Sequence, residues 1–281
     1  MSLEKCLAFS TLLACMRIDR PNADLLSVVS DTAERFGSFV IGLVAKQASA
    51  RVHSRGAGPF EPQEHDVRAF IERASAAETE FRGSMSKVGK LEWRPQLTLG
   101  PASEHIANEA RSADLVVAPI DDQDWSFFPS GQTHLGDLLL RLGRPVLAVP
   151  SGASGLELNK VLVCWKDSRE ARRAVADALP MLQASKRVDV VEIVEAEGVD
   201  ASRRRLDSVG DWLARNGVES HCSAEVSTGP EARQLAATAR DLKADLIVAG
   251  AFGHSRLREW AFGGVTKDLL LQAECCVLAS H

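Results

Sequence analysis

Glycines near the end of the chain have the spacing that most suggests chemistry. Two residues separate Gly250 from Gly253, nine more precede Gly263, and a helix is predicted to begin directly after it. Glycine lets a backbone approach a phosphate chain without a Cβ clash, and the amides at a helix start can donate to an anion. We therefore expect a phosphate-binding segment made mainly of main chain. Its candidate residues are Gly250, Gly253, Gly263, Gly264, Val265 and Thr266.

Two other interpretations of this segment stay open. The glycines can be ordinary turn and cap residues. Alternatively, Gly253-His254-Ser255 resembles the nucleophile elbow Gly-x-Ser-x-Gly, and Asp268 and His281 follow in the chain order of an α/β hydrolase. Leu257 stands where the elbow requires a glycine, so a hydrolase is the weakest of the alternatives.

A second group of candidates follows an apolar run in the middle of the chain. Trp165 ends that run, so its ring can stack on a base, and Lys166 and Asp167 come next. Val194, at the end of the following apolar run, completes the candidate binding residues. For Asp167 or Ser168, a role as the N-cap of the next helix is the competing explanation.

An internal repeat indicates how these residues are positioned. Three pairs of similar segments are separated by the same 131 residues: 112–119 and 243–250, 137–140 and 268–271, and 146–148 and 277–279. A constant separation indicates two related halves, which we place at residues 1–150 and 156–281. The stretch 150–155, rich in Ser and Gly, is expected to be a flexible linker.

Each half alternates short β-branched runs with segments of helical period. The predicted strands are 3–13, 39–45, 91–99, 114–119 and 145–149, then 160–165, 187–194, 218–226, 245–251 and 275–280. Helices are predicted over 169–183, 201–216, 231–243 and 265–273. This order predicts an α/β fold of two doubly wound, five-stranded, mostly parallel sheets, in which ligands bind beyond the carboxyl ends of the strands.

Composition narrows the possible functions and locations. The formal net charge of −5 does not suit a nucleic-acid partner, and no apolar run has the ~20 residues needed to cross a membrane. The six cysteines form no CxxC pair, and Cys and His residues lack metal-ligand spacing. We expect a cytoplasmic protein without a bound metal in its fold, and we expect no disulfide between Cys275 and Cys276.

Gly-x-x-Gly, nine residues, then Gly and a small residue resembles the ATP-binding signature of the universal stress protein family. The resemblance implies a Rossmann-like tandem of two such domains, ATP as the ligand, with Mg²⁺ as an accompanying cation, and a stress-linked regulatory role. Family members that bind ATP usually have Ser or Thr where this chain has Gly264, and an Asp at the end of the first strand, where it has Lys166. Members often dimerise through their last strand, so the two halves are expected to pair in this way within one chain, with a homodimer also possible.

The first half departs further from the signature. The separation of 131 places Pro119, Asp122, Gln132 and Thr133 where the second half has its glycines, so we expect a degenerate, structural half. No catalytic base or P-loop lysine is evident, so fast phosphoryl transfer is not expected, although slow ATP hydrolysis stays open. The alternative function is a non-nucleotide, pseudo-symmetric interaction or small-ligand-binding protein.

Overall fold

The structure, a computed structural model, describes residues 9–48, 64–120, 135–251 and 264–281. It contains two sets of five strands. The first set is β1 (Thr11–Cys15), β2 (Phe39–Gln47), β3 (Leu91–Thr98), β4 (Leu115–Pro119) and β5 (Val146–Val149). The second set is β6 (Lys160–Trp165), β7 (Arg187–Val194), β8 (Ser220–Val226), β9 (Leu246–Gly250) and β10 (Cys276–Ser280). All pairs within a set are parallel.

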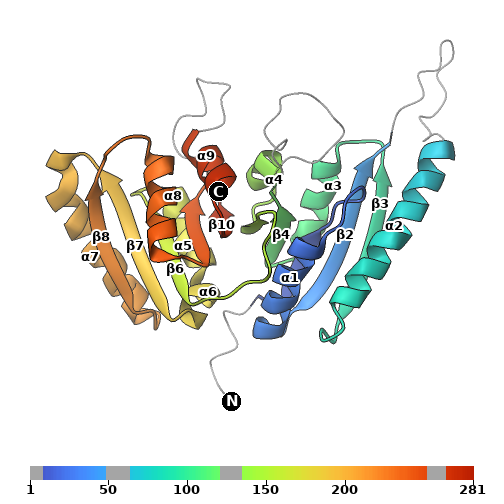
Figure 1. Cartoon of the computed structure of the whole chain (residues 1–281), viewed down its shortest axis with the longest axis horizontal. Helices are drawn as coiled ribbons and strands as arrows, with labels where there is room; N and C mark the ends of the chain where they lie inside the picture. The colour runs from blue at the N-terminus through green and yellow to red at the C-terminus, as the bar shows by residue number, and fades with distance from the viewer. Residues whose placement is uncertain (1–8, 49–63, 121–134, 252–263) are drawn as a thin grey trace, which may run out of the picture.

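The two sets join edge to edge into one ten-stranded sheet. Its order is β3-β2-β1-β4-β5-β10-β9-β6-β7-β8, and the central pair, β5 with β10, is antiparallel. Leu147 is paired there with Leu278, its own counterpart in the repeat. Figure 1 shows the blue-to-green half and the yellow-to-red half on the two sides of this junction. The predicted fold class is confirmed, and so is the pairing of the last strands.

Helices cover both faces of the sheet and enclose two cores that run through both halves. One face carries α1 (Ala23–Phe36), α2 (Glu64–Ser84), α5 (Arg169–Asp177), α6 (Leu179–Ala184) and α7 (Val199–Arg215). The other carries α3 (Ala102–Glu109), α4 (Leu135–Arg141), α8 (Glu231–Leu242) and α9 (Gly264–Gln272). Strands covered on both faces must be apolar on both, which explains the continuous runs in β4, β6 and β9.

The structure corrects two of the predicted elements. The first strand was expected over 3–13, but β1 begins at Thr11 and continues to Cys15; residues 3–8 lie outside the described ranges. The single helix expected over 169–183 is two helices, α5 and α6, which meet at Ala178. Pro180 lies in the first turn of α6, where its missing N–H is tolerated, whereas inside one continuous helix it would remove a hydrogen bond.

The expectation of a flexible linker is also wrong, because α1 holds the connecting segment. Asp24 accepts a hydrogen bond from the Gly152 amide at 2.9 Å, and Asp31 accepts one from the Leu156 amide at 2.8 Å. Between them, the Ser27 hydroxyl donates to the carbonyl of Ser154 at 2.7 Å. These side chains follow one another along one face of α1, so the linker is bound to the first half.

Candidate functional site

The strand order of the second half reverses between β6 and β9. The chain leaves β6 toward β7 and β8 and then returns to β9 and β10 on the other side. Trp165, Val194 and Gly250 are the last residues of β6, β7 and β9. Because these strands are parallel, the three residues lie at one edge of the sheet, the edge where doubly wound sheets bind ligands.

Lys166 extends from this edge toward the helix that follows β8. Its side chain is 70% exposed, and its Nζ lies 3.4 Å from an Oε2 of Glu231, the first residue of α8. An exposed pair at this distance contributes little to stability. Lys166 therefore places a solvent-accessible positive charge beside the point where the strand order reverses.

Ser168, rather than Asp167, is the N-cap of α5. The Ser168 hydroxyl accepts a hydrogen bond from the amide of Ala171 at 3.2 Å. Asp167 instead accepts a hydrogen bond from the Arg172 guanidinium at 2.5 Å. Of the two residues that the sequence left open for this role, Ser168 satisfies one of the unpaired amides at the helix start.

Gly250 has a packing role that its place in the glycine signature did not reveal. A Cβ at this position would lie 2.6 Å from the amide nitrogen of Ala171 and 2.7 Å from the carbonyl carbon of Glu170. The first turn of α5 thus covers Gly250 on one face of the sheet. Only glycine permits this close approach of helix and strand.

The remaining glycine candidates are only partly within the described ranges. Gly264 is the first residue of α9, Val265 is 39% exposed, and the Thr266 side chain is buried. Gly253 and Gly263 lie outside the described residues. The amides in the first turn of a helix have no acceptor within the helix itself, so the start of α9 suits an anion.

The residues of the possible hydrolase are also partly outside the described ranges. Ser255 is not among the described residues. His281 directs its Nδ1 to the carbonyl oxygen of Ala251 at 3.1 Å, and Asp268 is exposed on α9. Among the described residues, His281 thus links the residue after β10 to the residue after β9.

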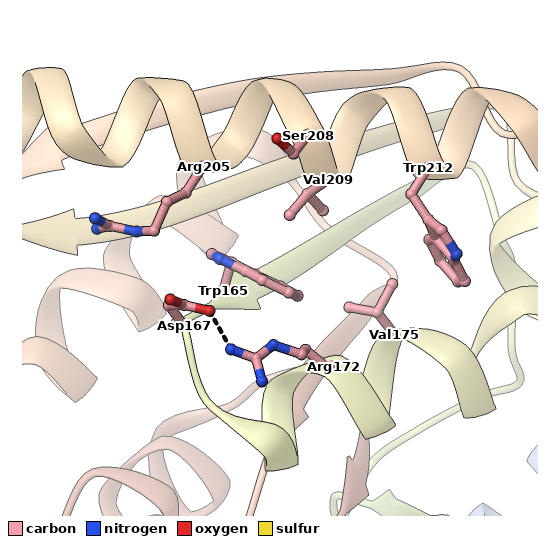
Figure 2. Close-up of a pocket in the computed structure, with 8 residues that line it drawn as sticks. All are labelled: Trp165, Asp167, Arg172, Val175, Arg205, Ser208, Val209 and Trp212. Atoms are coloured by element: carbon pink, nitrogen blue, oxygen red, sulfur yellow. Dashed lines mark hydrogen bonds and ion pairs between the residues drawn. The ribbon is translucent and has the colours of Figure 1, made fainter.

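A pocket with a volume of about 470 Å³ opens between α5 and α7. Figure 2 shows the Trp165 ring lying between the two helices, with its nitrogen-bearing end toward Arg205 and its other end toward Val175. Trp165 is 7% exposed, and its Nε1 has no hydrogen-bond partner among the described residues. The lining residues are Trp165, Asp167, Arg172, Val175, Arg205, Ser208, Val209 and Trp212.

A buried acidic residue next to Trp165 was not identified from the sequence. Glu192 is paired with Trp165 across β6 and β7 and is 4% exposed. Its carboxylate accepts hydrogen bonds from the Ser202 hydroxyl and from the Arg205 guanidinium, the latter at 3.1 and 3.2 Å. The sequence did contain a signal, because an acidic residue inside a largely apolar strand is buried as a charge and therefore requires polar partners.

In the first half, Arg17 occupies the position of Lys166. Ala14 pairs with Val117 as Val163 pairs with Val248, which places the two basic residues at equivalent points after the strand. The Arg17 guanidinium donates to the carbonyl of Ile120 at 2.8 Å. It therefore spans the space between the ends of β1 and β4, where a ligand of the first half would lie.

Asn22 closes the same loop of the first half. It is 3% exposed, and its side-chain oxygen accepts from the Arg17 amide at 2.7 Å while its own amide donates to Glu80 at 2.7 Å. These contacts fix the segment between β1 and α1.

Across the described ranges, no helix is both long and apolar enough to cross a bilayer. Nor do the same residues gather three His, Cys, Asp or Glu side chains in an arrangement that would hold a metal ion.

Comparison with known proteins agrees with the geometry. The model of the universal stress protein family matches residues 157–281. No curated protein sequence matches the chain significantly. The family match shows that the second half is a universal stress protein domain.

Solved structures extend the likeness to both halves. A universal stress protein from Archaeoglobus fulgidus DSM 4304 matches with a TM-score of 0.75 and 14% identity, over 96% of this chain and 98% of that one. A functionally unknown protein from Pseudomonas aeruginosa PAO1 matches with a TM-score of 0.62 and 16% identity, over 99% and 94%. At these identities the matches show a shared fold.

A universal stress protein from Archaeoglobus fulgidus, solved in complex with dAMP, matches about half of this chain. The identity is 21%, the TM-score is 0.36, and the match covers 44% of this chain and 98% of that one.

Proposed function

We propose that this chain, a member of the universal stress protein family, binds an adenine nucleotide in its second half and acts as a stress-linked regulatory module. ATP is the nucleotide that we propose first. The observation that carries this proposal is the reversal of strand order between β6 and β9. Lys166 lies beside this point, directly after the end of β6. The helix that follows β9 in the chain begins at Gly264.

Charge and main chain at this edge suit a phosphate group. The amides of Gly264 and Val265, in the first turn of α9, would donate to phosphate oxygens, and the helix dipole favours a negative charge there. The Lys166 ammonium, which is 70% exposed and forms a long pair with Glu231, would supply a positive charge. Mg²⁺, if it accompanies ATP, would be held by the phosphates more than by protein ligands.

A nucleotide-titration series tests the proposal directly. Ligand that binds only the folded state stabilises it by RT ln(1 + [L]/Kd), so millimolar ATP should raise the melting temperature measurably. ATP, ADP and AMP, each with and without Mg²⁺, separate the contributions of the phosphates and the cation. No stabilisation by any of the three at millimolar concentration would overturn the proposal. Mass spectrometry of the denatured protein would identify nucleotide that copurifies.

Replacement of Lys166 by Ala gives a sharper version of the same test. If the ammonium contacts a phosphate, ATP affinity should fall by about 10-fold, the loss expected for one charged hydrogen bond. Lys186→Ala is the matched control, because Lys186 is exposed and precedes β7, at the opposite end of the strand from the proposed site. Equal ATP affinities in the two variants would show that Lys166 does not contact the nucleotide.

The pocket between α5 and α7 favours a second candidate function, the binding of a small molecule other than a nucleotide. Its volume of about 470 Å³ lies within the range of small-molecule sites, and both aromatic and charged side chains line it.

A further inference from the structure

The pocket between α5 and α7 exists in the second half because the two helices there are separated. α5 packs chiefly on β9 and β10, whereas α7 packs on β7 and β8, and the end of β6 lies between them. In the first half the equivalent helices, α1 and α2, lie directly against each other.

Gly250 provides a physical reason for this difference. Without a Cβ it lets the first turn of α5 lie on the end of β9, which brings the helix toward β10 and away from α7. The repeat places Pro119 at the equivalent position of the first half, where the side chain has the Cβ that Gly250 lacks. Pro180 lies in the first turn of α6, and α5 is a short helix that ends at Asp177.

The chemistry of the lining is defined by two buried donors that lack acceptors. The Trp165 Nε1 and the Arg205 Nε are both inaccessible to solvent and have no hydrogen-bond partner among the described residues. Figure 2 shows both groups at the same end of the pocket. A buried N–H without an acceptor costs about 1–3 kcal/mol, so a ligand that offers an acceptor to both groups would recover that loss.

The rest of the pocket is suited to a flat apolar group. Val175 and Val209 face each other from α5 and α7, and Trp212 lies at the end of the pocket away from Arg205 (Figure 2). Arg172 and Arg205 are each paired with an acid, Asp167 and Glu192, so the pocket is not a site for a highly charged polyanion. A single acceptor group on an aromatic body matches this lining.

We propose that the pocket between α5 and α7 is a second ligand site, distinct from the nucleotide site although Trp165 ends its strand at the same edge, and that it takes a flat aromatic molecule bearing one carboxylate or similar acceptor. The acceptor lies at the end formed by Trp165 and Arg205. The aromatic body lies between the two valines, against Trp212. Gly250 and the first turn of α5 separate this site from the start of α9.

Isothermal titration calorimetry with two matched probes tests the assignment. The probes are 2-naphthoate and 2-naphthylmethylammonium, which share the ring system but carry an acceptor and a donor. The wild-type protein should bind one 2-naphthoate per chain and should bind the ammonium probe at least about 10-fold more weakly, as expected when a charged hydrogen bond is lost. Absence of saturable 2-naphthoate binding, or equal binding of both probes, would overturn the proposal.

Two variants locate the bound probe, and one serves as control. Trp165→Phe keeps an aromatic ring but removes the N–H donor together with part of the indole, and should weaken 2-naphthoate binding by about 5-fold or more. Val209→Trp fills the pocket from α7 and should abolish binding while ATP binding persists. Trp93→Phe changes a tryptophan of the first half, which packs against Phe81, and should bind as the wild type does.

Three results would contradict the second site. Unchanged 2-naphthoate binding in both pocket variants would place the probe elsewhere. An equal loss in Trp93→Phe would indicate a general effect on folding. Competition between ATP and 2-naphthoate would show that the pocket belongs to the nucleotide site, so ATP is titrated into the 2-naphthoate-saturated protein as part of the same series.

Discussion

Leu147 of β5 is paired directly with Leu278 of β10, and these two residues are each other's counterparts in the sequence repeat. The flanking pairs are Val146 with Ala279 and Ala148 with Val277. The repeat converts one flanking pair into the other, because Val146 corresponds to Val277 and Ala148 corresponds to Ala279. The pseudo-two-fold axis of the chain therefore passes between the two leucines, and the central strands pair as two copies of one domain would.

Truncation of either central leucine should destabilise the protein strongly. Both side chains are 0% exposed in the core, so Leu147→Ala or Leu278→Ala should cost about 2–5 kcal/mol of unfolding free energy. Because the residues face each other, the double variant should depart from additivity by about 0.5 kcal/mol or more. Urea unfolding followed by circular dichroism measures all three.

Ile71→Ala is the control for these substitutions. Ile71 is 60% exposed on α2, so its truncation should change the unfolding free energy by less than about 0.5 kcal/mol. A loss at Leu147 no larger than that at Ile71 would mean that the β5–β10 junction contributes little to stability.

A methyl group at position 250 should destabilise the second half. In Gly250→Ala the new Cβ would meet backbone atoms of Glu170 and Ala171 at less than 3 Å, and backbone cannot move aside as a flexible side chain can. Overpacking of this kind costs about 1–3 kcal/mol. Gly83→Ala is the contrast, because Gly83 lies in α2 with open space around it and should gain up to about 1 kcal/mol from helix propensity. Thermal denaturation distinguishes the two; equal melting temperatures would contradict the packing role of Gly250.

The buried cysteines should resist alkylation in the native protein. Burial raises the pKa of Cys15 and of Cys276 to about 12, and it also raises the pKa of Cys164. The thiolate is the nucleophile, so a rise of about three units lowers its fraction at pH 8 by about 10³. Cys222 and Cys275 are both partly exposed, but burial raises the pKa of Cys275 to about 12, so Cys222 should be modified first among the described cysteines. Peptide mass spectrometry after a timed iodoacetamide reaction gives the order; rapid modification of native Cys15 would contradict it.

The contribution of Glu170 to stability should depend on acid pH. Burial alone would raise the pKa of this carboxyl, but hydrogen bonds from Arg169, from the backbone and from Ser168 together hold its pKa below the ordinary 4.5. A lowered folded-state pKa means that the charged group stabilises the fold above about pH 4.5, and that this contribution disappears as the pH falls through the lower folded-state pKa.

Glu170→Gln should therefore differ most from the wild type near neutral pH and converge with it on acidification. Urea midpoints at pH 7, 5, 4 and 3 measure the difference. Glu72→Gln, exposed on α2, is the control and should run parallel to the wild type. A Glu170→Gln difference that stays constant from pH 7 to pH 3 would show that the charge of Glu170 does not stabilise the fold.

The fold was predictable because the repeat and the strand pattern are properties of the chain itself. Strands buried on both faces are largely apolar, so β6 and β7 were predicted with the bounds that the structure has, although β7 also contains the buried Asp189 and Glu192. The ordered linker was not predicted, because its order depends on hydrogen bonds to Asp24 and Asp31, which lie more than 120 residues earlier in the chain. The packing of α1 brings these two side chains to the linker.

The site was less predictable for a related reason. The residues at the strand ends follow from topology, so Trp165, Val194 and Gly250 were expected at one edge. The second role of Gly250 and the buried Glu192 were not expected, since they depend on which helix lies above each strand and how closely. Spacing along the chain contains no such information.

The junction of β5 with β10 also determines where the sheet can and cannot grow. Each half alone would present an open strand edge, a template for aggregation, and in the tandem chain each edge covers the other. The outer margins are β3, which contains Pro95 and the pair of Arg94 with Glu92, and β8, with an exposed His221. Proline and charge are features that blunt a strand edge. Fusion of the two halves thus protects the sheet at its centre, and polar composition protects it at its ends.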